Sequence, residues 1–534
     1  MVEMNQESIS VAVSGGGHRA TAWALGVMQG LVDCDLNPSV TSIVSVSGGS
    51  IANGAVAQSM DFQSVDRAEF DEKIEPLVDL ISDQGLFVFG PSTNRYVFVT
   101  VATVSLFLGM LTSAASVVLA AMVSWSPLWH TGWGLLVLVG TIVFSRSRGF
   151  DGLARWLVLT SLFVGLGGLV GATLTQSFGP RSAAPLLVSV FAAIATFILF
   201  VVLWARRGRV LVKALDSMAF GGASLESIRR TVNHVFVAAD LETADALYLS
   251  PHFVSSYRRG LTTPNGVSLA QAVQASAALP GAFPPSILTV TDRFKRPWTQ
   301  DGPDESTRQL PLSDGGAYDN MGVQWDTRRR KRLECEWGSS CPEGMGPAPT
   351  LLVVANASAP WTWRRWTAKN PLSTEIASLS RNQGIQYDQT TATRRQVLFN
   401  TFSTAADTGK GLKGIILTIS RTPFEVCDRY VKNEASPFHV RAVETRNLIA
   451  RSAGCSADDC DHDSLRCSAR VHWGGVVAFN SSVPTTLGKV GRPATDSIMS
   501  HARTAATAYL YVLHGLGDPT TIAAPSAIPD RETL

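Results

Sequence analysis

A short apolar run at residues 41–46 ends abruptly in a Ser-Gly-Gly-Ser turn at residues 47–50, and this stretch constrains the fold more than any other. The run predicts a β-strand, and residues 51–57 favour a helix. A strand that turns this sharply into a helix exposes the hydroxyl of Ser47 at its apex, beside a helix N-terminus. Serine and glycine also fill ordinary turns, so this stretch alone leaves both a nucleophile and a plain turn open.

A second unit of the same kind precedes it. Residues 8–14 form a β-rich run that leads into Gly15, Gly16 and Gly17, and residues 21–32 favour a helix. Two successive strand–turn–helix units predict an α/β sandwich with a mainly parallel sheet, with both turns at the carboxyl ends of their strands. Three glycines direct backbone N–H groups at one spot, which suits an oxyanion or a phosphate. The Gly-Lys-Ser/Thr of a nucleotide phosphate loop is missing.

The chain is unusually poor in charge, with 46% apolar residues and only 16% charged ones, against roughly 25% in soluble domains. Residues 96–145 contain no Asp, Glu, Lys or Arg. A membrane helix needs about 20 apolar residues, so we expect an inserted four-helix transmembrane segment. Arginines flank the segment and lie between its second and third helices, which favours a multi-pass protein of the cell membrane with cytoplasmic termini and a cytoplasmic catalytic domain. The four predicted spans are residues 97–123, 128–145, 156–175 and 184–205.

Elements of an α/β domain resume after this insertion. An acidic helix precedes the insertion at residues 64–82; strands are expected at residues 232–238, 351–354 and 414–419, and helices at residues 269–278 and 496–516. We therefore divide the chain into an N-terminal part of the catalytic domain, the inserted region, a C-terminal part of the catalytic domain and a disordered tail. These four parts are residues 1–95, 96–209, 210–517 and 518–534.

A carboxylate supplies the third piece of chemistry. Asp314 follows an apolar run and is followed at once by two glycines, so its carboxylate lies on a turn with little to cover it. A carboxylate beside a serine can accept the hydroxyl proton directly, without a histidine. Asp-Gly turns are common, however, so by itself this motif leaves a structural turn open.

These three pieces, in this order, resemble the patatin-like phospholipase family. The block Ala-Ser-Ala-Ala-Leu-Pro-Gly-Ala-Phe-Pro-Pro at residues 275–285, the strand end at residues 239–243 and Asn320 extend the resemblance, which covers about residues 1–95 and 210–325. It implies a three-layer α/β/α sandwich, with Ser47 as nucleophile and Asp314 as general base. The same resemblance assigns the oxyanion hole to the N–H groups of residues 15–17.

The sequence departs from the family pattern at two points. Ser45 stands where the family's Gly-x-Ser-x-Gly turn begins with glycine. The glycine loop continues as His18-Arg19-Ala20, which is similar to the cytosolic phospholipase branch of the fold. That likeness implies a substrate head-group role for Arg19.

The expected function is that of a membrane-anchored serine lipid acyl hydrolase, of phospholipase A or lysophospholipase type, that works through an acyl-enzyme. An acyltransferase or triacylglycerol lipase with the same dyad, or a catalytically silent receptor or scaffold, remains an alternative. The expected partners are a membrane phospholipid or other lipid ester and the bilayer. A net charge of +2 gives no indication of nucleic acid.

No cofactor is expected, and neither is a metal. The seven cysteines are odd in number and scattered, which indicates reduced thiols. Cys455, Cys460, His462 and Cys467 lie close together in the sequence, but their spacing matches no standard zinc pattern.

Overall fold

The computed structural model divides the chain into two compact units, Met1–Leu86 together with Leu215–Leu534, and Phe87–Ala214. The residues that the structure describes are 7–85, 194, 197, 198, 201, 202, 208–228, 231–280, 283–295, 309–358, 371–455 and 467–528.

Strands and helices alternate through the N-terminal part and again after β8. The strands are β1 Ile9–Val13, β2 Val40–Val46, β3 Asn233–Asp240, β4 Asp245–Leu249, β5 Val254–Ser256, β6 Gly260–Thr262, β7 Ser286–Thr289, β8 Gln309–Asp314, β9 Leu351–Asn356 and β10 Lys413–Thr418. The helices are α1 Gly17–Asp33, α2 Gly48–Ser59, α3 Arg67–Asp79, α8 Leu269–Ser276, α9 Gly316–Asp319, α10 Arg330–Trp337, α11 Pro371–Thr408, α12 Phe424–Asp428, α13 His439–Ser452, α14 Ser468–Ser482 and α15 Arg492–His514.

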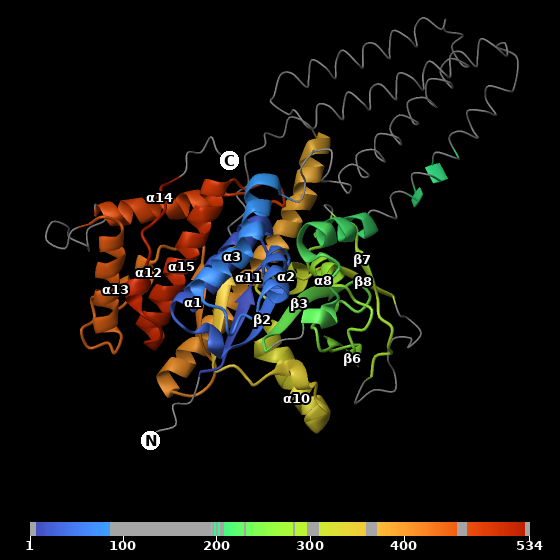
Figure 1. Ribbon diagram of the computed structural model, residues 1–534, viewed down its shortest axis with the longest axis horizontal. Helices are drawn as coiled ribbons and strands as arrows, with labels where there is room; N and C mark the ends of the chain where they lie inside the picture. The colour runs from blue at the N-terminus through green and yellow to red at the C-terminus, as the bar shows by residue number, and fades with distance from the viewer. Residues whose placement is uncertain are drawn as a thin grey trace, which may run out of the picture. The chain divides into compact units, whose positions relative to one another are not determined.

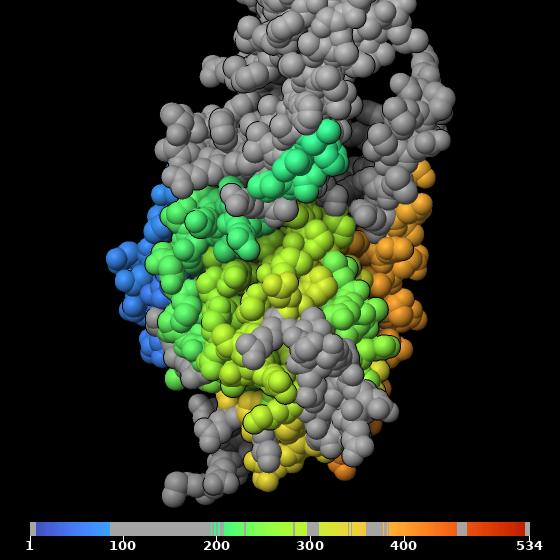
Figure 2. Space-filling view, turned by 90° about the vertical axis from the view of Figure 1, so that its right-hand side faces the viewer, coloured from blue at the N-terminus to red at the C-terminus, as the bar shows by residue number. Residues whose placement is uncertain are grey.

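One sheet joins all ten of these strands, and its two halves differ. The order is β10-β9-β1-β2-β3-β4-β5-β6, with β8 paired to β3 and β7 paired to β8. Pairing is parallel from β10 to β3 and antiparallel from β3 onward. The parallel half agrees with the expected α/β sheet. Figure 2 views the side of the molecule on which the antiparallel half lies, in green and yellow.

Successive side chains along each strand point to opposite faces of the sheet, and each face packs against a different set of helices. On one face Val44, Val46 and Val237 pack with Trp325 and with α10, and Ala12 and Val354 pack with α11. This face therefore carries α9, α10 and α11.

The opposite face is covered by α1, α2 and α8, and α15 packs onto α1. Figure 1 shows α12 to α15 gathered beside α1. Helix α1 is buried along nearly its whole length, as expected for a helix enclosed between a sheet and a second helix. The close approach of α15 requires a small residue, because a Cβ at Gly30 would lie 2.9 Å from the Cβ of Ala506. These layers form the α/β/α sandwich.

The elements predicted from hydrophobic periodicity are confirmed to within a few residues. The predicted strand at residues 351–354 is β9, the one at 414–419 is β10, and the closing helix at 496–516 is α15. Helix α11 was not predicted, because its sequence is polar and has no strong apolar stripe. Within the segment expected to be a disordered tail, Pro519–Thr521 forms a 3₁₀-helix with Pro519 buried.

The predicted transmembrane region requires a correction. Among the residues that the structure describes, no helix is both long enough and apolar enough to cross a membrane. The two longest, α11 and α15, contain charged side chains such as Asp388, Arg394 and Arg503. This finding contradicts the inserted four-helix transmembrane segment and the four-span localisation in the cell membrane. The predicted spans 97–123, 128–145 and 156–175 lie outside the described residues, and 184–205 contains only five of them.

Candidate active site

Ser47 lies at the junction between β2 and α2, in a sharply turned backbone. Its backbone angles, φ 51° and ψ −122°, fall in a region that residues other than glycine rarely adopt. The turn packs tightly against the glycine loop, because a Cβ at Gly48 would collide with the carbonyl of Gly17. Glycine at this position therefore allows the two turns to touch.

Ser45 ties the turn to its own helix. Its buried hydroxyl accepts hydrogen bonds from Ser50 Oγ at 3.1 Å and Asn53 Nδ2 at 2.9 Å, and it donates to the Val235 carbonyl at 3.3 Å. A glycine at this position would leave both α2 side chains without this partner. The residue that departs from the family pattern thus makes contacts that hold α2 against β2 and β3.

Ser276, at the end of α8, joins the serine turn to the aspartate loop. Its Oγ accepts from the Ser47 N–H at 3.1 Å and donates to the Val237 carbonyl at 2.7 Å. Its carbonyl accepts from Gly315 N at 3.1 Å, and the nearby Ala278 carbonyl accepts from Asp314 N at 3.0 Å. Only the family resemblance singled out the block at residues 275–285. In the structure, Ser276 and Ala278 of this block hold the serine turn and the aspartate loop together.

Asp314 lies at the end of β8, with 1% of its surface exposed. Its Oδ1 accepts from the Gly316 N–H at 2.7 Å. Burial is the largest influence and raises the pKa of Asp314 to about 6, while hydrogen bonding from the Ser47 hydroxyl and from Gly316 lowers it. Among the described residues, Oδ2 has no hydrogen bond that meets standard geometry, and the Ser47 hydroxyl is close enough to lower the pKa of the carboxyl group.

The glycine loop lies directly beside Ser47. A Cβ at Gly15 would be 3.2 Å from the Ser47 Cβ. The N–H of Gly15 donates to the Asn320 carbonyl at 3.0 Å. Among the described residues, the N–H groups of Gly16 and Gly17 have no such partner. Two of the three predicted oxyanion donors are therefore available at the N-terminus of α1.

Arg19 points away from open solvent and is 4% exposed. Its Nη1 donates to the Val483 carbonyl at 2.6 Å and its Nη2 to Thr485 Oγ1 at 3.2 Å. The neighbouring His18 donates its backbone N–H to the Thr486 carbonyl at 2.8 Å. The segment between α14 and α15 thus covers the start of α1, and a head-group contact by Arg19 would require this segment to move.

Tyr387 of α11 lies beside the aspartate loop, and no sequence pattern predicted it as a site residue. A Cβ at Gly316 would lie 2.7 Å from its Cε1, and burial, with a smaller contribution from the charge of Asp314, raises the pKa of Tyr387 above its usual range. Within the part of the chain that the structure describes, its buried hydroxyl has no hydrogen-bond partner. A long helix with no apolar stripe thus brings a phenol to the aspartate loop.

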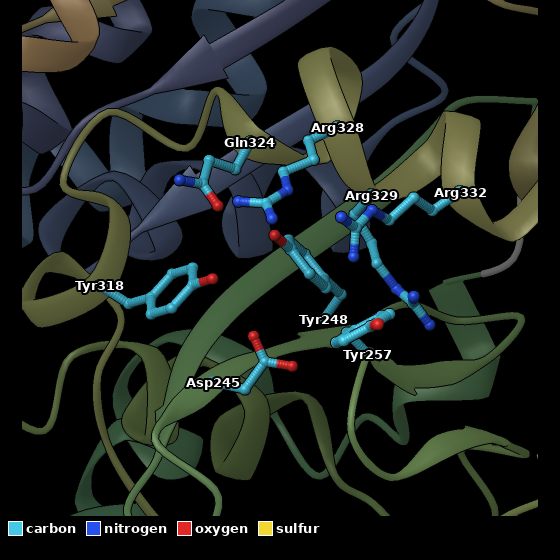
Figure 3. Close-up of a pocket in the computed structure, with 8 residues that line it drawn as sticks. All are labelled: Asp245, Tyr248, Tyr257, Tyr318, Gln324, Arg328, Arg329 and Arg332. Carbon is cyan, nitrogen blue, oxygen red and sulfur yellow. The ribbon is translucent and has the colours of Figure 1, made fainter. Parts of the chain in front are cut away.

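A small polar cavity of about 40 Å³ lies beside α9. In Figure 3 the hydroxyls of Tyr248 and Tyr318 point into it, above Asp245. Many of its side chains are engaged with neighbouring groups, because Ser256 Oγ donates to Asp245 at 3.2 Å and Arg332 lies 4.6 Å above the Tyr257 ring. Its volume is far below the roughly 300–1,000 Å³ of ligand pockets, so we read it as structural support for the α9 loop.

No group of three or more metal-binding side chains occurs in the part of the chain that the structure describes. The sulfur atoms of Cys455 and Cys467 are 3.6 Å apart, both as free thiols. Cys460 and His462 lie outside the described residues.

Comparison with known proteins identifies a family whose sequence model matches this chain. The sequence model of the patatin-like phospholipase family matches residues 11–324, which is more than half of the chain. A search of curated proteins finds no match.

Two solved structures are similar at low identity. The human GIVD cytosolic phospholipase A2 is 12% identical with a TM-score of 0.32, over 72% of this chain and 46% of that one. VipD from Legionella pneumophila is 13% identical with a TM-score of 0.26, over 99% of this chain and 89% of that one. The chain thus spans less than half the length of the human phospholipase structure. By the extent of the family match, the chain belongs to the patatin-like phospholipase family.

Proposed function

We propose that the protein is a lipid acyl hydrolase that uses Ser47 and Asp314 as a dyad through an acyl-enzyme. The observation that carries this proposal is the pairing of a strained, turn-borne serine with a buried carboxylate whose pKa is raised to about 6. A base of that pKa is largely ionised at neutral pH and still basic enough to accept a hydroxyl proton. Membership of a phospholipase family supports a lipid ester as the substrate.

In the proposed acylation step, Asp314 accepts the proton of the Ser47 hydroxyl while Oγ attacks the ester carbonyl carbon. The N–H groups of Gly16 and Gly17 stabilise the negative charge on the carbonyl oxygen. As the tetrahedral intermediate collapses, the leaving alcohol takes the proton from Asp314 and the acyl group stays on Ser47.

In the proposed deacylation step, Asp314 accepts a proton from water, and the resulting hydroxide attacks the acyl-enzyme. Ser47 leaves as an alkoxide and takes the proton back, which releases the fatty acid. The Ser276 contact to the Ser47 N–H, at 3.1 Å, supports a turn that stays fixed through both steps.

The test is fatty-acid release from phospholipid vesicles by wild type, Ser47→Ala and Asp314→Asn. We expect each variant to lose at least about a thousandfold in rate, since removing a nucleophile or its base removes the covalent route. Ser64→Ala and Asp83→Asn, at exposed positions in the same part of the chain, are the matched controls.

A fluorophosphonate probe gives an independent reading of the nucleophile. It should label wild type and fail to label Ser47→Ala. Fatty-acid release that survives in either dyad variant would end the assignment of Ser47 and Asp314.

A further inference from the structure

A cavity of about 690 Å³ lies along the edge of the sheet, away from Ser47 and Asp314. It is lined by the C-terminal half of α11, by β10 and by side chains near the end of α15. Among the described strands, β10 is the outermost of its half of the sheet and pairs with β9 alone. The volume lies within the range of about 300–1,000 Å³ for ligand pockets, and none of the dyad or glycine-loop residues lines it.

Apolar side chains form much of the wall. The lining includes Phe399 and Phe402 of α11, Ile416 of β10 and Leu513 of α15, and Phe402 and Ile416 also pack against the core cluster that contains Leu398. The Phe399 side chain is 54% exposed although its helix neighbour Leu398 is buried in the core. An exposed phenylalanine inside a concave surface indicates a place where an apolar ligand would remove it from water.

All the charged side chains in the lining are positive. Arg395, Lys413, Arg421 and Arg429 contribute to it, and no Asp or Glu does. His514 also lines it, but burial lowers its pKa to about 4, so it stays neutral at physiological pH.

Two of these cations already have acidic partners. Lys413 pairs with Glu7 at 3.2 Å and Arg421 with Glu425 at 3.6 Å. Among the described residues, Arg395 and Arg429 have no acidic partner. An apolar cavity bordered by two unpaired guanidinium groups is complementary to a molecule with an apolar body and a negative head.

We propose that this cavity binds a single-chain anionic amphiphile, such as a long-chain fatty acid. The acyl chain lies between α11 and β10, and the carboxylate pairs with Arg395 and Arg429. The inference deepens the proposed function and rests on it only for the source of the ligand, because ester hydrolysis at Ser47 releases a molecule of this class.

Binding is measured by isothermal titration calorimetry on the full-length Ser47→Ala protein, so that turnover plays no part. Hexadecanoate, at concentrations below micelle formation, should bind saturably. Hexadecanol and hexadecyltrimethylammonium, which keep the chain and change the head, should bind at least about tenfold more weakly. Equal affinity for the three heads would overturn the assignment of the arginines.

Variants locate the site. Arg395→Glu with Arg429→Glu should weaken hexadecanoate binding about tenfold or more, because both cations become repulsive. Ala406→Trp, at an exposed lining position, should fill the cavity and remove binding while the thermal melting curve stays unchanged. Lys432→Glu makes a charge reversal at an exposed position outside the lining and is the matched control.

Binding that is unchanged in both cavity variants, or lost equally in Lys432→Glu, would refute the proposal. Saturable binding of an extended peptide at the β10 edge, with none of hexadecanoate, would also refute it. Absence of esterase activity in wild type, with hexadecanoate binding intact, would refute only the proposed function.

Discussion

Asp314→Asn should make the protein more stable at neutral pH while it removes activity. The carboxyl group is 1% exposed, and burial raises its pKa from the ordinary 3.8 to about 6. A raised pKa means that folding favours the protonated acid, so this group destabilises the folded state increasingly as pH rises from about 3.8 to about 6, and fully above that. The difference of about 2 pKa units corresponds to about 3 kcal/mol.

Asparagine keeps the shape of the side chain and removes the charge. Its amide oxygen can still accept the Gly316 N–H hydrogen bond, which is 2.7 Å long in the wild type. At pH 8 the variant should therefore gain up to about 3 kcal/mol, or about 3–4 °C in Tm for a unit of this size. Well below pH 3.8 the wild-type acid is protonated in both folded and unfolded states, and the gain should vanish.

The assay is thermal unfolding of wild type, Asp314→Asn and the exposed control Asp83→Asn at pH values from 4 to 8. A difference between wild type and Asp314→Asn that grows between pH 4 and pH 7 supports the reasoning. A difference that is constant with pH, or that reverses in sign, would refute the view that Asp314 is held against its own ionisation.

Two further predictions concern the same turn. The kcat/KM of wild type for a soluble ester should fall about tenfold per pH unit below about pH 6, because Asp314 becomes protonated. His18 is not the source of this fall, because burial lowers its pKa to about 4. A pH profile that stays flat down to pH 5 would contradict the assignment of Asp314 as the base. Ser45→Gly should lower the free energy of unfolding by about 1–3 kcal/mol, because Ser50 and Asn53 lose their buried partner. Urea unfolding measures this change, with Ser64→Gly as the control. Equal stability of the two variants would show that the Ser45 contacts are energetically unimportant.

Local patterns predicted the parts of the site that are short in sequence. The change from an apolar run to Ser-Gly-Gly places Ser47 after β2, and the structure has this turn at the expected residue. The glycine triplet likewise falls between β1 and α1. These predictions succeed because strand, turn and helix depend on neighbouring residues, whose periodicity and conformational limits are visible in the sequence.

The resemblance to a family brought together residues that periodicity could not. Asp314 is 267 positions from Ser47, and no pattern within either segment indicates that the two meet. The predicted transmembrane insertion was wrong because a run without charges indicates only a preference for apolar surroundings. Among the described residues, no helix has the length and apolarity that a membrane span needs.

The sequence by itself determined which segments become strands and helices and which residues stand at their turns. Tertiary structure alone decided the partners of those residues: Arg19 is occupied by Val483 and Thr485, the Gly15 N–H is taken by Asn320, and Tyr387 reaches the aspartate loop. The physical reason is that amphipathic patterns report which face of an element is buried, whereas hydrogen-bond partners across hundreds of residues depend on how the faces pack.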